Sequence, residues 1–224
     1  MNTALKASST TVSKKKGKRS LGRRILRFLS FIATGLLGLF LALFIYYFFM
    51  RPGDARWGAT DEEVERVMPG DELIPHAAVV STQAIGINAS AEKVWPWLVQ
   101  IGKGRGGLYS YDWLENLFLQ DIHSVDHILP EYQNLKPGDT ISIGSPPPVP
   151  VYAVDPINHA LVLGDSKFST WVLAVYPVDE SHSRLLIRYR DNLSGLYHVV
   201  FDPATLTMTK EMLVGIRDRA EKNS

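Results

Sequence analysis

The sequence predicts an α+β domain, built from antiparallel strands and one long C-terminal helix, that follows a single membrane-spanning helix. Three observations predict this architecture. An uncharged apolar run lies near the N-terminus, short alternating segments separated by turns occupy the middle of the chain, and the C-terminal segment carries apolar side chains at helical spacing. With 224 residues, the chain has room for one ordinary domain plus the first helix.

Charge is distributed unevenly along the chain. The formal net charge is +1, but residues 1–50 contain nine Lys or Arg and no acidic residue. The remainder holds 15 of the 24 basic residues and all 23 acidic ones, a net charge of −8. A domain this acidic is poorly suited to neutralise phosphates, so no nucleic-acid partner is expected. The absence of cysteine excludes disulfides, zinc–thiolate sites and cysteine nucleophiles.

The apolar run extends from Phe28 to Met50, 23 residues without a charge. As a helix it would be about 35 Å long, enough to cross a hydrocarbon core of about 30 Å. A cleaved signal peptide would have a shorter apolar region followed by small residues, whereas this run ends in bulky aromatic side chains. We therefore expect residues 25–50 to form a transmembrane helix.

Eight of the nine basic residues in 1–50 lie in a tail (residues 1–24) that we expect to be disordered, and the ninth, Arg27, lies in the first turn of the predicted helix. The positive-inside rule then places the N-terminus in the cytoplasm and the rest of the chain on the other side of the cell membrane. Membrane lipids are the expected partners of Phe28–Met50 and, through their anionic headgroups, of the basic tail.

Residues 51–76 are expected to form a structured neck with one short helix. Thr60 is a good N-cap for a helix over 61–67, and Glu63 completes a capping box. The sequence Met68-Pro69-Gly70 would end this helix.

A strand over 77–87 and two helices are expected next. Ser90 caps the first helix (91–101), in which Pro96 should cause a kink or a division into two short helices. The second helix follows Ser110 and is rich in aromatic residues.

Strands are then expected over 140–143, 149–154, 160–163, 168–178 and 184–190, two pairs of them joined by hairpin turns. In the segment 184–190, three arginines (Arg184, Arg188 and Arg190) alternate with apolar residues, as in a half-buried antiparallel strand. A last strand over 196–201 should precede a final helix that Asp202 caps and Pro203 begins.

This order of elements, with the string VWPWLVQIGKGRGGLYSYDWLENL (residues 94–117) and the ending MTKEMLVGIRDRAE (208–221), resembles the SRPBCC superfamily, which includes START, Bet v 1 and polyketide cyclase/dehydrase-related proteins. The resemblance covers about residues 77–222 and gives a domain over 77–224. It implies a helix-grip fold, in which a curved antiparallel sheet wraps around the C-terminal helix. It also implies a deep cavity for apolar molecules, but no common set of catalytic residues.

Aromatic residues are the candidate ligand-binding residues, because in a helix-grip fold some of them would line the cavity although aromatic side chains also dominate ordinary cores. The candidates are Trp97, Tyr109, Tyr111, Trp113, Trp171 and Tyr189.

Three other patterns have simpler explanations than a site. The glycines Gly102, Gly104 and Gly107 match G-x-G-x-x-G, but they follow a helix, whereas a dinucleotide motif follows a strand. His123 and His127 have metal-compatible spacing in a short polar segment that favours solvated loop histidines. Asp112 and Glu115, a potential catalytic pair, lie where acidic residues complement a helix dipole. No metal, cofactor or catalytic residue is assigned.

The sequence thus predicts a membrane-anchored domain that binds a lipophilic small molecule. Two alternatives remain open: an enzyme of the cyclase, dehydratase or hydrolase type on the same fold, and a protein-interaction module whose cavity is filled by its own side chains. Polar groups isolated in the cavity beside a perturbed acid or base would favour the enzyme.

Overall fold

The computed structural model describes residues 13–117, 119–144, 146–193 and 195–222. The chain divides into two compact units, residues 1–45 and 46–224. The first unit contains helix α1 (Ser13–Ile45). The second contains all the strands and the remaining helices.

Helix α1 begins twelve residues before the predicted start at residue 25. Residues 13–24 are thus helical rather than disordered, and the part of the tail before Ser13 lies outside the described residues. Lys, Arg and Leu are good helix formers, and elongating an existing helix is far easier than starting one. From Leu21 to Met50 almost all side chains are exposed. The helical stretch Leu21–Asp54 is long and apolar enough to cross a membrane.

The second unit begins with the π-helical turn η1 (Tyr46–Met50) and the short helix α2 (Arg51–Asp54). In the neck, helix α3 (Asp61–Glu65) has the predicted capping box. The Glu63 amide donates to the Thr60 hydroxyl at 3.3 Å, and the Thr60 amide donates to the Glu63 carboxylate at 2.9 Å. A 3₁₀ turn, η2 (Asp71–Leu73), follows, and the neck ends at the sheet.

Six antiparallel strands form one sheet in the order β1-β6-β5-β4-β3-β2. Their bounds are β1 (Val79–Ile87), β2 (Thr140–Ile141), β3 (Val149–Asp155), β4 (Ala160–Gly164), β5 (Ser169–Pro177) and β6 (Ser183–Asp191). Each of them lies where alternation and turn residues predict a strand.

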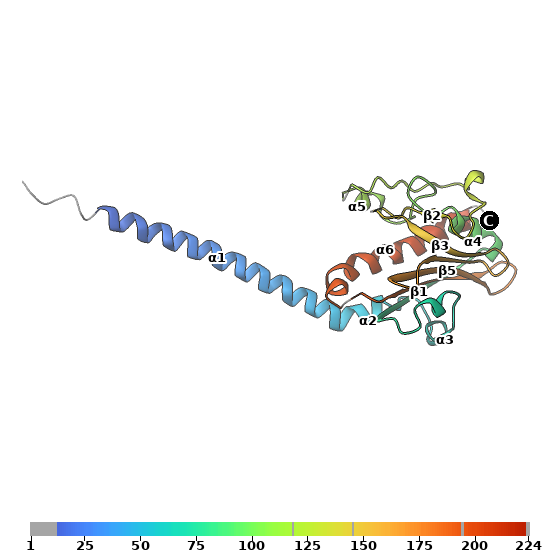
Figure 1. Cartoon of the computed structure of the whole chain (residues 1–224), viewed down its shortest axis with the longest axis horizontal. Helices are drawn as coiled ribbons and strands as arrows, with labels where there is room; N and C mark the ends of the chain where they lie inside the picture. The colour runs from blue at the N-terminus through green and yellow to red at the C-terminus, as the bar shows by residue number, and fades with distance from the viewer. Residues whose placement is uncertain (1–12, 118, 145, 194, 223–224) are drawn as a thin grey trace, which may run out of the picture. The chain divides into compact units, whose positions relative to one another are not determined.

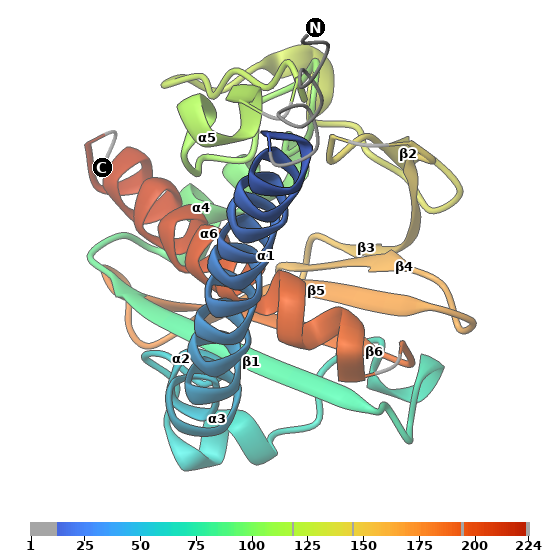
Figure 2. The ribbon, with the colours of Figure 1, turned by 90° about the vertical axis from the view of Figure 1, so that its left-hand side faces the viewer.

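Helices α4 (Ala91–Val99), α5 (Asp112–Leu117) and α6 (Gly195–Lys222) complete the domain, together with a 3₁₀ turn, η3 (Pro130–Tyr132). Of the two outcomes predicted at Pro96, the division into two short helices does not occur: α4 continues through Pro96 as one helix. Helix α6 runs across one face of the sheet (Figures 1 and 2). Its buried residues Met212, Leu213 and Ile216 join a core with β1, β4, β5, β6 and α4. This arrangement is the predicted helix-grip fold.

The prediction of a strand over 196–201 was wrong. Helix α6 begins at Gly195 and passes through Asp202 and Pro203, so these residues neither cap nor start it. Short apolar runs do not distinguish strand from helix by periodicity. Here Asp202 accepts a hydrogen bond from His198, one helical turn earlier, a contact that a helix over this segment allows and an extended strand does not.

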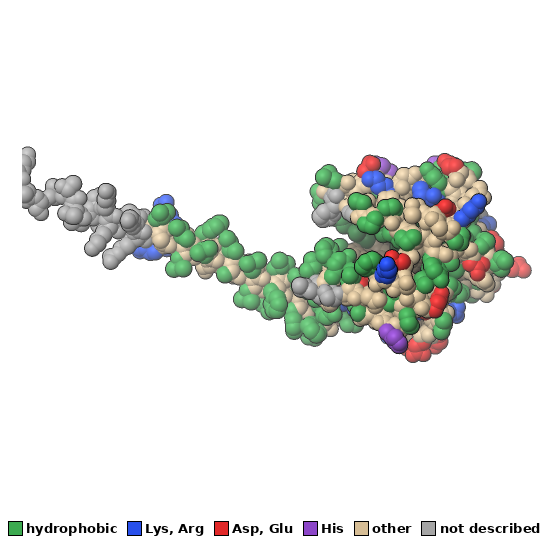
Figure 3. Space-filling view, in the orientation of Figure 1, with side chains coloured by type: hydrophobic (Ala, Val, Ile, Leu, Met, Phe, Trp, Pro, Cys, Tyr) green, Lys and Arg blue, Asp and Glu red, His purple; other side chains and the backbone are tan. Residues whose placement is uncertain are grey.

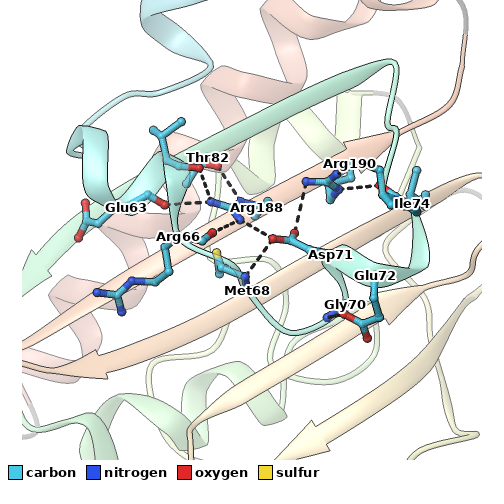
Figure 4. Close-up of polar contacts among 12 residues, drawn as sticks. Glu63, Arg66, Met68, Gly70, Asp71, Glu72, Ile74, Thr82, Arg188 and Arg190 are labelled. Carbon is cyan, nitrogen blue, oxygen red and sulfur yellow. Dashed lines mark hydrogen bonds and ion pairs between the residues drawn. The ribbon is translucent and has the colours of Figure 1, made fainter.

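The neck packs on the other face of the sheet, where the three arginines of β6 hydrogen-bond to it. Figure 4 shows the contacts of two of them, Arg188 and Arg190. The Arg188 side chain is 2 % exposed. It donates to Asp71 Oδ2 at 2.7 Å, to Thr82 Oγ1 at 2.9 Å, and to backbone carbonyls of the neck. Arg184 pairs with Glu63 at 2.7 Å. The predicted arginine face is therefore a structural contact between β6 and the neck.

Candidate functional site

A cavity of about 310 Å³ lies between α6, the sheet and the segment that carries α5. Figure 3 shows the surface hollowed between this segment and the N-terminal part of α6. Most of the lining is apolar, from Val79, Leu108, Ile143, Val149, Leu163, Trp171, Ile187, Leu206, Met208 and Met212. Such a lining follows from strand alternation, since every second residue of a strand faces α6.

The structure places two of the six candidate aromatic residues, Trp171 and Tyr189, on the cavity wall, where they are register partners on β5 and β6. Trp97 and Tyr109 are packed in the core, each 1 % exposed, with their ring centroids 5.8 Å apart.

Two candidates lie away from the cavity lining. Tyr111 is partly exposed beside Trp113, and Trp113 is 69 % exposed on α5. Aromatic character alone does not indicate whether these side chains lie near the cavity. One side of α5 is buried, whereas the other is exposed to solvent.

Glu115 is a buried acid on the cavity wall. It is 3 % exposed, and among the described residues neither carboxylate oxygen has a hydrogen-bond partner. Burial, followed by the charge of Asp112, raises the pKa of Glu115 to about 7, while the Ser110 hydroxyl nearby opposes the shift. A carboxyl with such a pKa can hold or release a proton near neutral pH.

Asp112 has a different role from Glu115. Its carboxylate accepts from the Ser124 amide and the Ser124 hydroxyl, both at 2.7 Å. The two acids of α5 are therefore not equivalent, although their spacing suggested a common interpretation as dipole-complementing residues.

A second polar group on the cavity wall centres on Asp202 of α6. The Asp202 carboxylate accepts from His198 Nδ1 at 2.8 Å through one oxygen, and from Arg51 Nε through the other. All three residues line the cavity. His198 Nε2 and Arg51 Nη2 are buried and have no partner among the described residues.

Asp191, at the end of β6, extends this group. It is completely buried and accepts from the Tyr189 hydroxyl and the Leu193 amide, and its Oδ1 lies 3.8 Å from His198 Nε2. Burial and the adjacent Asp191 raise the pKa of the Tyr189 hydroxyl, so it remains protonated and donates.

Sequence patterns give little sign of this polar group. His198 lay in a segment predicted as a strand, where it would not face Asp202, and Arg51 was considered only as the residue after the anchor. With 195–203 assigned to a helix, the spacing of His198 and Asp202 would have suggested their pairing.

The other patterns noted in the sequence do not form sites. Gly102 and Gly107 pair across a tight turn, with Gly102 at a φ of 125°. His123 and His127 are exposed and lie beside Asp121 and Asp126. Within the described ranges, no group of three His, Asp or Glu side chains is arranged to hold a metal ion.

Comparison with known proteins gives structural similarities only. No family model matches the chain, and no curated protein matches it by sequence. Among solved structures, it is similar to CalC, a self-sacrificing resistance protein from Micromonospora echinospora (11% identity, TM-score 0.42, 65% of this chain and 96% of CalC). It is also similar to the Zhui aromatase/cyclase from Streptomyces sp. R1128 (10% identity, TM-score 0.36, 65% and 94%).

The fold is SRPBCC-like. This description rests on the sheet order and on the position of α6, and it concerns the fold alone. The function must be argued from the cavity and from its polar groups.

Proposed function

We propose that this chain is a membrane-anchored protein that binds a lipophilic small molecule in the cavity between α6 and the sheet. The observation that carries the proposal is the open, mostly apolar cavity of about 310 Å³ with a few buried polar groups on its wall. Ligand sites for small molecules typically have this composition, and their volumes begin at roughly this size. The same open space speaks against a domain that fills its own cavity to serve only as an interaction module.

The membrane anchor would support ligand binding by raising the local concentration of the ligand around the domain. Lipophilic molecules partition into bilayers, so a tethered domain meets them at a higher local concentration than a free one. Nine cations precede the span or begin it, whereas only Arg51 and Arg56 follow it closely, and this bias favours a cytoplasmic N-terminus and a domain on the other side.

A fluorescence titration of the full chain in lipid nanodiscs, with an apolar probe and empty discs as reference, tests the proposal. Replacing Trp171 by Ala removes a large apolar surface from the cavity and should weaken probe binding by about 1–3 kcal/mol. Trp113→Ala is the matched control, because this tryptophan is exposed on α5 and should leave binding unchanged. Equal effects of the two substitutions would contradict binding in this cavity.

An acid–base enzyme is the second candidate function, and Glu115 is the observation that favours it. A buried carboxyl with a pKa of about 7 on the wall of an apolar cavity is suited to donate a proton to a bound substrate or to accept one from it. If the chain is such an enzyme, Glu115→Gln should abolish turnover of a ligand identified by co-purification while leaving its affinity within a few fold. Unchanged conversion by Glu115→Gln would remove this candidate.

A further inference from the structure

We infer that the N-terminal end of α6 and the turn before β5 form a second contact with the lipid bilayer, beside the end of the membrane span. The contact surface, the apolar rim, consists of Phe168, Leu193, Tyr197, Val200 and Phe201. The contact rests on the membrane anchor of the proposed function and goes beyond it, because it fixes which side of the domain faces the lipid and where a ligand enters the cavity.

The rim residues are exposed and lie together. Tyr197 and Phe201, one helical turn apart on α6, are 42 % and 50 % exposed, and their ring centroids are 4.7 Å apart. The Phe168 carbonyl accepts from the Asn192 amide at 3.1 Å, so the turn before β5 lies beside the segment that carries Leu193. Two segments of the chain therefore form one exposed apolar surface.

The α6 side of the rim also differs from the rest of the domain in charge. Between Asn192 and Thr209 the sequence contains one charged residue, Asp202, although residues 51–224 have a net charge of −8. Asp202 is 6 % exposed and pairs with Arg51, so the described part of this segment presents no exposed charge. Lys167, an exposed cation next to the rim, suits anionic headgroups. Apolar and aromatic side chains without exposed charge are typical of surfaces that enter the boundary between headgroups and acyl chains.

The end of the span is held against the rim, and this identifies lipid as the occupant. The apolar run ends at Met50, and the next residue, Arg51, binds Asp202, which directly follows the rim on α6. A side-chain carbon added at Gly195 would lie 4.0 Å from the Tyr47 hydroxyl. All these residues belong to one compact unit. An arginine at the end of a span lies in the headgroup region, which is roughly 6 Å thick on each side of the bilayer. The rim therefore meets the same bilayer surface.

The rim borders the cavity. Tyr197 belongs to both, and Ser169, which also lines the cavity, directly follows Phe168. Figure 3 shows the hollow in the surface beside the N-terminal part of α6. With the rim on the bilayer, a lipophilic molecule passes between the membrane and the cavity without exposing its apolar surface to water, which would be unfavourable.

Fluorescent labels placed at single positions of the full chain test the contact. The chain has no cysteine, so one introduced cysteine carries one environment-sensitive fluorophore. Phe201→Cys and Phe168→Cys, in separate variants, place the label on the rim. Each labelled chain is held in phosphatidylcholine nanodiscs, with or without lipid that carries a nitroxide quencher near the top of its acyl chain. We expect both labels to shift their emission to the blue and to lose most of their fluorescence to the quencher.

Two further labels are the controls. Phe168 and Val178 flank opposite ends of β5 and are 61 % and 63 % exposed, so Val178→Cys is a matched position roughly 30 Å from the rim. Its label should keep a water-like emission and escape quenching. Leu39→Cys, in the middle of the apolar run, should be quenched by lipid that carries the nitroxide in the middle of its acyl chain. All four positions are exposed, so the labels displace no core residue, and unchanged melting temperatures verify the fold.

The outcomes separate the rim contact from the proposed function. A water-like emission at either rim label, or equal quenching of the Val178 label, would overturn the contact while the anchor stands. Blue-shifted rim labels that lipid nitroxides do not quench would mean that protein, such as a second copy of this chain, covers the rim, and this too would overturn it. If the Leu39 label is not quenched, the anchor and the contact fail together. Ligand binding is measured separately by the Trp171→Ala titration, so a failure there leaves the contact standing.

Discussion

At the scale of single residues, the cavity wall carries several buried polar atoms that have no hydrogen-bond partner among the described residues. Buried polar groups are nearly always hydrogen-bonded, because an unpaired one costs about 1–3 kcal/mol. On the cavity wall, Ser110, Glu115, Arg51 and His198 each have at least one buried atom without a partner among the described residues. The unpaired atoms on the cavity wall are available to hydrogen-bond polar groups of a bound molecule.

The pKa of Glu115 gives a prediction about stability against pH. This carboxyl has a raised pKa in the folded chain, about 7 against an ordinary 4.5, so the native state holds its proton more tightly than the unfolded state does. Stability should therefore fall as the pH rises from 4.5 to 7, by up to about 3 kcal/mol from this residue.

Denaturant unfolding across this pH range, with Glu115→Gln beside the unsubstituted chain, measures the effect. The Gln variant cannot ionise, so the difference in unfolding free energy between the two chains should change with pH between 4.5 and 7 and level off above. Parallel curves for the two chains would contradict the raised pKa.

At the scale of elements, the sequence predicted what periodicity and turn chemistry determine, and missed what tertiary contacts determine. All six strands, the capping box at Thr60 and the arginine face of β6 were predicted. The start of α6 was not, since the run before Asp202 fits a strand equally well and only the packing of His198 against Asp202 decides between them. The cavity followed from the family resemblance, but its polar residues come from segments far apart in the sequence, a combination that periodicity does not reveal.

Helix α6 should contribute much of the stability of the domain. Leu213 is completely buried between α6 and the sheet, so Leu213→Ala should cost about 2–5 kcal/mol, through lost apolar contact and the space left behind. Thr207→Ala, on the exposed side of the same helix, should cost less than about 0.5 kcal/mol. Thermal unfolding of the two variants provides the comparison, and equal melting temperatures would show that α6 does not close the core.

At the scale of the whole molecule, the chain joins an apolar helix to an acidic domain. The charge asymmetry predicts one orientation in the membrane. A reporter that is active only in the cytoplasm should work when fused before Met1 and should fail when fused after Ser224. The reverse pattern would place the domain on the cytoplasmic side.

Residues 46–224 form a compact unit with its own core, so the domain should fold without α1. A chain that begins at Tyr46 should be soluble and should show the same Leu213→Ala effect as the full chain. Aggregation of this shortened chain at every pH and salt concentration would show that the domain boundary is misplaced.

Native mass spectrometry of the full chain released from nanodiscs tests the central claim most directly, because it detects a bound molecule by its mass, whatever its chemical identity. The unsubstituted chain should carry a lipophilic adduct, and Trp113→Ala should carry it equally. Ser81→Phe, which places a large side chain in the cavity, should lose it. An unsubstituted chain without an adduct, or an adduct retained in full by Ser81→Phe, would contradict a ligand site between α6 and the sheet.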